Sequence, residues 1–119
     1  MEREKAGNIY LEDDTCYPLY VGHNLVGRYS ETLKNDIGVM CNDAHLGRQH
    51  FMIEVKINET GQCDYILSDY RSKNGTSVIL QAYKLKKELK EDSQIYLRNG
   101  DIVVAGKTKF RIETTDQIK

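Results

Sequence analysis

The side chains best suited to chemistry in this sequence are basic residues that stand in and beside three tight turns. These turns are Gly27-Arg28, Leu46–His50 and Ser72–Thr76, and their cations are Arg28, Arg48, Arg71 and Lys73. Cationic side chains and turn amides bind anions because both present N–H donors to a negative charge. The formal net charge of the chain is only -1, so a convergence of basic turns is a local feature. The sequence therefore predicts an anion pocket built from loops at one end of a sheet.

Short apolar stretches between turn signals supply the elements that must position these loops. Residues 51–57 alternate in their second half as a half-buried strand does, and Glu59–Gly61 turns them toward 63–67 as a hairpin. Asn74-Gly75 predicts another hairpin turn, since both residues tolerate positive φ. Many stretches spaced about ten residues apart are typical of an all-β sandwich or barrel. The expected strands are 9–11, 16–21, 24–26, 37–39, 51–57, 63–67, 76–80, 102–105 and 109–112.

The segment 83–92 does not fit this strand pattern. It contains helix-forming residues, mixed charges and a leucine pair, Leu85 and Leu89, at the i,i+4 spacing of one helix face. These residues alone leave a short helix and a strand-and-loop connection equally open.

Composition bounds the class of protein. A chain of 119 residues with 39% hydrophobic and 29% charged residues is expected to form one soluble domain with one core. The pI near 6.3 argues against direct nucleic-acid binding, which requires a basic face. No apolar run approaches the roughly 20 residues needed to span a bilayer, and no signal peptide is expected.

Neither a metal site nor catalysis is indicated by the remaining polar residues. Cys16, Cys41 and Cys63 are odd in number and widely spaced, as expected of free thiols in a reducing compartment. Asp43 and His45 stand near Cys41, but the spacing matches no tetrahedral zinc pattern, and no cofactor is expected. No nucleophile–base pair is visible either, so the sequence favours a protein that is not an enzyme.

Several of these motifs together resemble a forkhead-associated (FHA) domain. They are Gly27-Arg28, Arg48–His50, Asp69 with Ser72, Asn74–Thr76, Gly100-Asp101 and Gly106, in order and at matching intervals. The resemblance covers residues 8–113 and leaves 1–7 as a leader and 114–119 as a tail. It implies a two-sheet antiparallel β-sandwich that binds phosphothreonine peptides through loops at one end. It also favours a strand-and-loop connection over a helix for 83–92.

The resemblance assigns roles to individual residues. Arg28 matches the arginine that contacts the phosphate, and Asn74 the asparagine that fixes the peptide backbone beside the phosphothreonine. Arg48 and Lys73 occupy loop positions that assist the phosphate, and Ser72 belongs to the same loop. The scaffold positions are matched by Gly27, His50 and Gly75, and His50 is expected to be a structural histidine that bridges loops.

Gly47 departs from the family, which usually has a serine whose hydroxyl and amide both face the phosphate. Glycine keeps an amide and loses the hydroxyl, and it frees the backbone. A hydrogen bond to a charged partner contributes roughly 1.5–3 kcal/mol, so phosphopeptide affinity is expected to fall by roughly 10- to 150-fold. The phosphothreonine pocket is therefore expected to be degraded.

Two functions of an interaction module follow. Within the family, Gly22–Arg28, Gln49-His50 and Ser72–Thr76 are similar to the N-terminal domain of mediator-of-DNA-damage-checkpoint adaptors. That similarity implies a nuclear, chromatin-associated adaptor in the DNA-damage response that acts mainly as a homodimer. Five tyrosines are expected to lie outside the core and to supply apolar area for self-association: Tyr10, Tyr17, Tyr20, Tyr83 and Tyr96. The alternative is a working phosphothreonine-peptide binding domain with a phosphoprotein partner.

Overall fold

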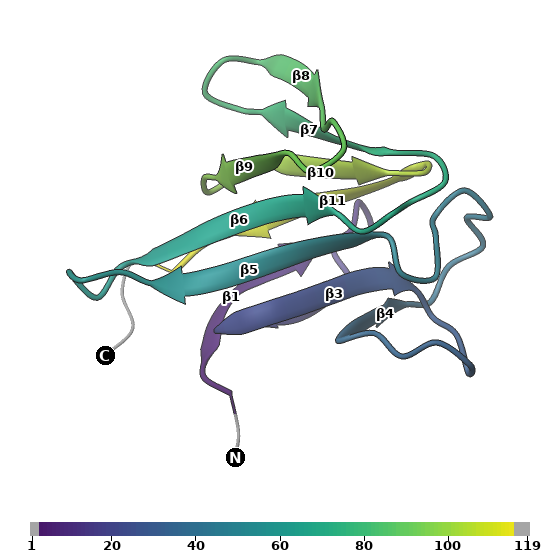
Figure 1. Cartoon of the computed structure of the whole chain (residues 1–119), viewed down its shortest axis with the longest axis horizontal. Coiled ribbons are helices and arrows are strands. Elements are labelled where there is room, and N and C mark those ends of the chain that lie inside the picture. Colours follow the sequence, from purple (N-terminus) through teal and green to yellow (C-terminus); the bar gives the residue numbers. More distant parts are fainter. Residues whose placement is uncertain (1–2, 116–119) are drawn as a thin grey trace.

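The fold is a sandwich of two β-sheets (Figure 1), as the sequence predicts. The structure is a computed structural model, and it describes residues 3–115. Its strands are β1 (Lys5–Tyr10), β2 (Cys16–Tyr20), β3 (Gly22–Arg28), β4 (Ile37–Val39), β5 (Phe51–Ile57), β6 (Cys63–Asp69), β7 (Thr76–Leu80), β8 (Leu85–Glu88), β9 (Gln94–Leu97), β10 (Ile102–Ala105) and β11 (Thr108–Glu113). No helix within the described part of the chain is long and apolar enough to cross a membrane.

The chain passes several times from one sheet to the other, so strands far apart in sequence pair with each other. One sheet has the order β2-β1-β11-β10-β7-β8, and the other has the order β4-β3-β5-β6-β9. All pairs are antiparallel except β3 with β4, which is parallel. The connections β3–β4, β4–β5, β6–β7 and β10–β11 lie at the same end of the sandwich (Figure 1).

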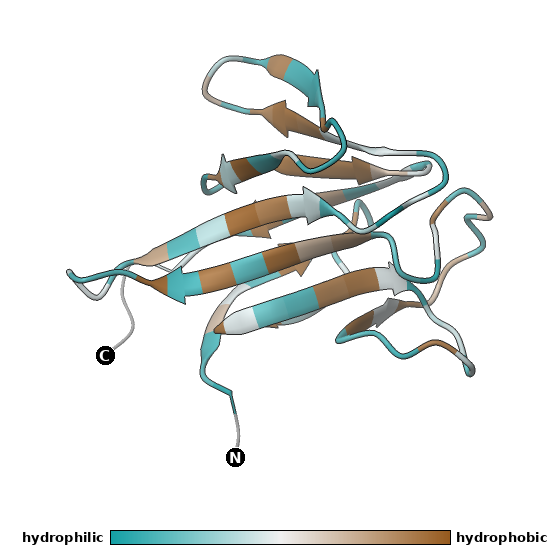
Figure 2. Cartoon of the chain, viewed as in Figure 1, coloured by the Kyte–Doolittle hydropathy of each residue, from teal (hydrophilic) through white to brown (hydrophobic). Residues whose placement is uncertain are grey.

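The core fills the space between the inner faces of the sheets. Period-2 alternation turns the buried side chains of β5, such as Ile53 and Val55, toward those of β10 and β11. Bands of apolar and polar residues follow one another along β3, β5 and β6 (Figure 2). Phe51 and Phe110 meet across the sheets, edge to face, with ring centroids 5.2 Å apart.

The hairpin predicted at Asn74-Gly75 is wrong. β6 belongs to the five-stranded sheet and β7 to the six-stranded sheet, so this connection crosses between sheets. Gly75 has φ +81°, as a tight turn requires, but Asn74 does not have positive φ. The turn residues marked a change of direction correctly, and the core contacts of β7 decide which sheet it joins. The β5–β6 hairpin forms as predicted, and β10 and β11 also pair as a hairpin.

The segment 83–92 contains the strand β8, and no residue of it is helical. β8 pairs with β7 at the edge of the six-stranded sheet, and all four of its side chains are exposed. The i,i+4 spacing of Leu85 and Leu89 therefore does not reflect a helix, because pairing with β7 determines the conformation of this segment.

At the other end of the chain, β1 begins at Lys5, three residues before the expected start of the domain at residue 8. Residues 116–119 of the expected tail lie outside the described part.

Candidate anion-binding site

Arg28 lies at the end of β3, where the alternation of the strand turns its side chain to the inner side. Asn24 and Val26 precede it on that side and are buried, whereas Arg28 is half-buried at the mouth of the sandwich. Its Nε donates a hydrogen bond to the Leu46 carbonyl at 3.2 Å. Its backbone N–H donates to the Gly47 carbonyl at 2.8 Å. The two Nη groups have no acceptor among residues 3–115, so this guanidinium retains donors for an anion.

Gly27 permits the β4–β5 connection to lie directly against β3. A Cβ at this position would stand 2.3 Å from the Arg48 carbonyl oxygen and 2.7 Å from the Gly47 carbonyl oxygen. Backbone atoms cannot yield as a flexible side chain does, so any larger residue would push the connection away. Gly27 is therefore the point of close backbone approach between β3 and the β4–β5 connection.

His50 is the buried link between two of the connections. Its Nδ1 accepts a hydrogen bond from the Gly47 N–H at 2.8 Å, and its Nε2 lies 2.8 Å from the Gly75 carbonyl oxygen. A carbonyl only accepts, so Nε2 carries the proton and the ring is the neutral Nε2–H tautomer. The ring is fully buried. His50 thus joins the β4–β5 connection to the β6–β7 connection through its two ring nitrogens.

Gly47 uses its amide in this scaffold. The family's serine is expected to turn its amide toward the phosphate, whereas the Gly47 amide donates to the buried His50 ring. The backbone does not require glycine here, because Gly47 is not among the residues with positive φ. A Cβ would meet His50 Nδ1 at 3.3 Å, which demands a shift of only a few tenths of an ångström. What the site lacks at Gly47 is therefore a hydroxyl donor and not a place for one.

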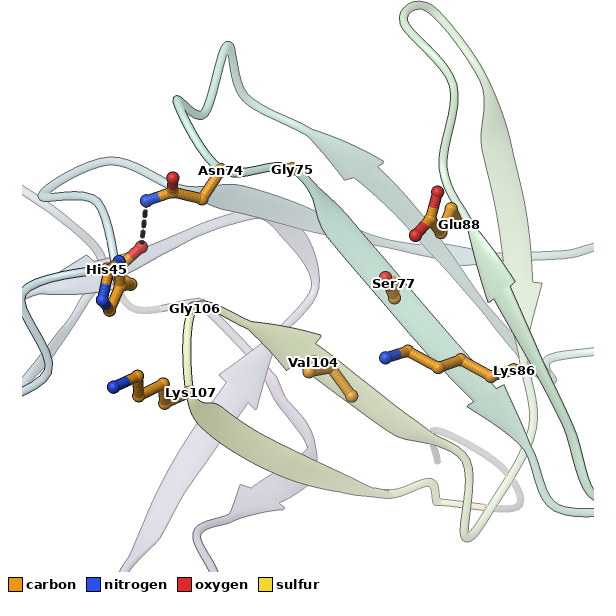
Figure 3. Close-up of a pocket in the computed structure, with 9 residues that line it drawn as sticks. All are labelled: His45, Asn74, Gly75, Ser77, Lys86, Glu88, Val104, Gly106 and Lys107. Atoms are coloured by element: carbon orange, nitrogen blue, oxygen red, sulfur yellow. Dashed lines mark hydrogen bonds between the residues drawn. The ribbon is translucent and has the colours of Figure 1, made fainter.

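Asn74 ties the β6–β7 connection to the β4–β5 connection. Its Nδ2 donates to the His45 carbonyl at 3.0 Å, and its Oδ1 points away from that bond (Figure 3). The β3–β4 connection is held from the same side, since Asn35 Nδ2 donates to the Arg48 carbonyl and Gln49 Nε2 to the Lys34 carbonyl. The three connections that carry the basic residues are therefore joined by hydrogen bonds.

The remaining predicted cations differ in how far they are engaged. Arg48 is exposed, and its Nη1 lies 3.4 Å from Thr32 Oγ1. Lys73 is exposed and has no ion-pair partner among the described residues. Arg71 is exposed with φ +52°, an uncommon conformation for a side chain of this size. Arg48 and Lys73 thus stand with free charge beside Arg28 and Asn74 at one end of the sandwich.

Ser72 is committed to the scaffold rather than to an anion. Its hydroxyl and its amide both donate to the carboxylate of Asp69, the amide at 3.0 Å, and the Thr76 hydroxyl donates to the same carboxylate. Burial raises the pKa of Asp69, but the hydrogen bonds from Ser72 and Thr76 outweigh burial, so this pKa lies below its ordinary value. Asp69 therefore stays ionised at neutral pH and fixes the turn before Asn74.

Asp43 joins a fourth connection to the site, a role that no motif in the sequence predicted. Its carboxylate accepts hydrogen bonds from the amides of His45 and Lys107 and from the hydroxyl of Thr108. Burial raises the pKa of Asp43, and these three bonds lower it further than burial raises it. Among the described residues no three His, Cys, Asp or Glu side chains cluster as a metal site would require. The aspartate that stood near Cys41 in the sequence is thus a cap for loop amides.

Gly106 completes this contact with the β10–β11 hairpin. It has φ +62°, and a Cβ would lie 2.6 Å from the backbone of His45 and Leu46. Gly106 is among the motif residues that the sequence shows. Only the fold shows that the backbone of His45 and Leu46 packs against it.

A groove of about 330 Å³ begins beside Asn74 and continues over the outer face of the six-stranded sheet (Figure 3). Its lining residues are His45, Asn74, Gly75, Ser77, Lys86, Glu88, Val104, Gly106 and Lys107. Two lysines, one glutamate and small polar groups therefore surround the surface next to the basic loops.

Comparison with known proteins identifies the family. The family model described as FHA domain matches residues 24–106, which is more than half of the chain. The chain belongs to the FHA family. This family consists of protein-interaction modules, which agrees with the class of function expected from the sequence. A search among curated proteins finds no match to this chain.

Solved structures agree with this assignment at the level of the fold. The FHA domain of an Arabidopsis thaliana hypothetical protein has a TM-score of 0.72 at 17% identity, over 100% of this chain and 95% of that one. An FHA domain solved in a study of phosphothreonine-dependent FHA interactions has a TM-score of 0.68 at 20% identity, over 92% and 97%. Mycobacterium tuberculosis EmbR, in complex with a low-affinity phosphopeptide, has a TM-score of 0.67 at 23% identity, over 96% of this chain and 26% of that one.

Proposed function

We propose that this FHA domain binds a phosphothreonine-containing segment of a partner protein through the basic loop end. The observation that carries the proposal is the state of Arg28. Its backbone and its Nε are fixed by the β4–β5 connection, while both Nη groups stay free at the mouth of the sandwich. A guanidinium held in this way offers N–H donors to a phosphate, and little further side-chain entropy is lost when the phosphate binds.

The charge of the site fits a phosphate group. A phosphothreonine carries about -1.5 to -2 charges at neutral pH and three strong acceptor oxygens. Arg28, Arg48 and Lys73 supply the positive charge. The side-chain oxygen of Asn74, Oδ1, has no donor among residues 3–115 and can accept from a peptide N–H. Relatives whose solved structures concern phosphothreonine-dependent binding or hold a phosphopeptide support this choice of ligand.

The missing hydroxyl at Gly47 makes the proposed binding weak rather than absent. Of the donors expected at the family's serine, the hydroxyl is missing and the amide bonds to His50. The cations and Asn74 remain, so we expect measurable affinity that is lower by roughly 10- to 150-fold than with a serine.

Isothermal titration with matched peptides tests the proposal. Three peptides that differ only at one position, which is phosphothreonine, phosphoserine or unmodified threonine, are titrated into the wild-type domain. The same peptides are titrated into the Arg28→Gln and Asn74→Ala variants. We expect binding of the phosphothreonine peptide alone, and loss of that binding in Arg28→Gln. Equal binding of the unmodified peptide, or full affinity of Arg28→Gln, would contradict the proposal.

Self-association is a second candidate function, and fewer of the five tyrosines are available for it than the sequence predicted. Tyr10 packs under Arg111 at 4.6 Å and Tyr20 under Arg3 at 5.6 Å, while Tyr17 packs against the core. Three of the five tyrosines expected to be surplus are therefore used inside the chain. Tyr83 and Tyr96 are the two that remain strongly exposed.

The outer face of the five-stranded sheet is the observation that favours a dimer. Tyr96 is 63% exposed on this face, and Leu25 and Met52, which lie opposite each other on β3 and β5, are half-buried there, whereas Ile66 opposite Tyr96 is buried. A two-fold dimer uses one patch twice, and a patch of apolar residues with a tyrosine suits such an interface. Sedimentation equilibrium at micromolar concentration tests it, with Tyr96→Lys as the disrupting variant and Tyr83→Lys as the control. A monomer mass throughout would rule the dimer out.

The cellular setting stays a prediction from resemblance. The similarity of Gly22–Arg28 and Ser72–Thr76 to damage-mediator adaptors supports a role on chromatin in the DNA-damage response. A fluorescent fusion of the full-length protein tests it in irradiated cells. We expect nuclear signal that gathers at damage sites and disperses with Arg28→Gln, and a cytoplasmic signal would contradict the assignment.

A further inference from the structure

One threonine of the chain lies against the proposed phosphate-binding site. Thr32 stands in the β3–β4 connection, and its Oγ1 lies 3.4 Å from Nη1 of Arg48. The hydroxyls of three other threonines meet oxygen acceptors of the scaffold, Thr60 at Asn58, Thr76 at Asp69 and Thr108 at Asp43. Among residues 3–115, Thr32 is therefore the one threonine whose hydroxyl contacts a cation of the site.

The β3–β4 connection holds this hydroxyl in place. Ser30 Oγ accepts hydrogen bonds from the backbone N–H groups of Thr32 and Leu33, each at 3.2 Å, and it lies 3.1 Å from Thr32 Oγ1. Asn35 Nδ2 donates to the Arg48 carbonyl, which fixes the same connection to the backbone of its neighbour. The contact between Thr32 and Arg48 is thus supported from both sides of the threonine.

Thr32 is also accessible to an enzyme. The residue is exposed, and residues 29–36 lie between β3 and β4 without belonging to either strand. Thr76 and Thr108, in contrast, lie in β7 and β11. A protein kinase must bring the acceptor hydroxyl to its catalytic aspartate, which a threonine in a paired strand does not permit. Thr32 meets this requirement while both sheets stay folded.

Arg48 has an unpaired positive charge for a phosphate at this position. It is exposed and has no carboxylate at ion-pair distance among residues 3–115. A phosphate on Thr32 would carry about -1.5 to -2 charges and three acceptor oxygens at neutral pH. Charge-assisted hydrogen bonds to the guanidinium would therefore replace the neutral contact of the hydroxyl. The same negative charge would repel a second phosphate that approaches Arg48.

We propose that Thr32 is a phosphorylation site, and that its phosphate engages Arg48 and weakens the binding of phosphothreonine partners. A protein kinase transfers the γ-phosphoryl group of ATP to Thr32 Oγ1. The O–P bond to ADP breaks, a new O–P bond forms and the hydroxyl proton is released. A phosphatase restores the hydroxyl by hydrolysis. The effect on partners rests on the proposed function, whereas the site and its contact with Arg48 do not.

Mass spectrometry tests whether the site is used. The full-length protein is isolated from its own cells in the presence of a phosphatase inhibitor, and trypsin cleavage after Arg28 and Lys34 gives a peptide of residues 29–34. Fragmentation of this peptide separates phosphate on Thr32 from phosphate on Ser30. We expect phosphate on Thr32. Its absence, or phosphate on Ser30 alone, would overturn the inference.

Fluorescence anisotropy measures the effect on binding. A labelled phosphothreonine peptide is titrated into the 119-residue chain, prepared with or without a phosphate on Thr32. We expect the phosphate to weaken binding about 5- to 20-fold, near the lower end for hydrogen bonds to a charged group, because Arg48 is exposed.

The matched control carries its phosphate on Thr60, an exposed residue of the β5–β6 turn at the far end of the sandwich (Figure 1). It should bind as the unmodified chain does, because salt screens the interaction over that distance. An equal loss from the two phosphates would overturn the inference, since it would show an effect of net charge and not of position.

A phosphorus NMR titration tests the contact with Arg48 without any peptide. The second pKa of a threonine phosphate is roughly 6, and a nearby guanidinium favours the dianion. We expect the acid dissociation constant of the Thr32 phosphate to be about 2- to 5-fold larger in the wild-type chain than in Arg48→Gln. Arg98→Gln, at an exposed arginine between β9 and β10, is the matched control and should leave the constant unchanged. Equal constants in the wild type and Arg48→Gln would overturn the contact.

The outcomes separate this inference from the proposed function. Unchanged peptide affinity of the phosphorylated chain would overturn the inference and leave the proposed function standing. No peptide binding by either form, with an Arg48-dependent dissociation constant, would contradict the proposed function and support the phosphorylation site. A dimer formed only by the phosphorylated chain, in sedimentation equilibrium, would mean that the phosphate binds a second copy, and would overturn the contact within one chain.

Discussion

His50 Nδ1 accepts a hydrogen bond from the Gly47 amide at 2.8 Å, inside a scaffold where the histidine ring is fully buried. This bond determines how glycine in place of the family's usual serine affects the site. The Gly47 amide holds the β4–β5 connection in place and is not offered to a ligand. The affinity that a serine at this position could restore is therefore that of one hydroxyl, in a loop whose backbone is already held by His50.

Restoring that hydroxyl should increase phosphopeptide affinity. Gly47→Ser adds a donor where a Cβ fits with a small shift, and a hydrogen bond to a charged group contributes roughly 1.5–3 kcal/mol, or about 10- to 150-fold. Titration calorimetry with a phosphothreonine peptide measures the change. Gly47→Ala is the matched control, because it adds the same Cβ without the hydroxyl and should give no gain. An equal gain in both variants would show that stiffening of the loop, and not the hydroxyl, limits binding.

Removal of the His50 ring should destabilise the whole domain. His50→Ala leaves the Gly47 N–H and the Gly75 carbonyl without partners and opens a cavity, for a loss of about 2–5 kcal/mol in the free energy of unfolding. Urea denaturation followed by circular dichroism measures it. His23→Ala, at a largely exposed histidine on β3, should change the free energy by less than about 0.5 kcal/mol. Comparable losses in both variants would contradict the bridging role.

Asp69 should make the stability of the domain fall in acid. Its pKa is lower in the folded chain than in the unfolded chain, so the unfolded state binds more protons and stability rises with pH. This contribution is complete above the unfolded pKa of 3.8 and is lost as pH falls through the lower folded value. Asp69→Asn should thus cost about 1.5–3 kcal/mol at pH 7 and clearly less at pH 3. Urea midpoints at the two pH values measure the difference.

The control for Asp69 is Glu59→Gln, a charge removal in the exposed β5–β6 turn that should change neither midpoint. If the cost of Asp69→Asn were as large at pH 3 as at pH 7, the carboxylate would owe its role to shape and not to charge.

A methyl group at Gly27 should separate the β4–β5 connection from β3. Gly27→Ala places a Cβ 2.3 Å from the Arg48 carbonyl oxygen, so we expect a loss of stability of about 1–3 kcal/mol together with loss of phosphopeptide binding. Thermal denaturation and anisotropy measure the two effects. Gly38→Ala on the neighbouring strand meets only the side chain and Cα of Tyr29 at 3.3 Å or more, and should retain binding. Retained binding in Gly27→Ala would contradict the close approach.

The sequence predicted those parts of the fold that local chemistry controls. Alternation in 51–57 and the turn at Glu59–Gly61 were sufficient for the β5–β6 hairpin, because adjacent strands with a short turn have few other partners. Asn74-Gly75 has equally clear turn chemistry, yet β7 joins the other sheet. A turn motif sets a change of direction, whereas the sheet that a strand joins depends on core packing between residues far apart in sequence.

The same division holds for the site. Motifs at Arg28, Arg48 and Asn74 indicated the basic end, since these residues stand beside turns in the sequence. The role of Asp43 was missed because two of its three hydrogen bonds come from Lys107 and Thr108, more than sixty residues away. The carbonyls of His45 and Leu46 were missed for a related reason, since a backbone acceptor has no residue signature. Lys86 became part of a surface only when β8 was found as an edge strand.

The most direct test of the central claim is an NMR titration of the ¹⁵N-labelled domain with a phosphothreonine peptide. Amide chemical shifts report which part of the molecule meets the phosphate, without any substitution that disturbs the fold. We predict that the largest shifts belong to Arg28, Arg48, Lys73 and Asn74, and that the unphosphorylated peptide leaves them unchanged. Shifts confined to the β5–β6 turn at the far end, or to Ile66 and Tyr96 on the five-stranded sheet, would contradict phosphate binding by the basic loops.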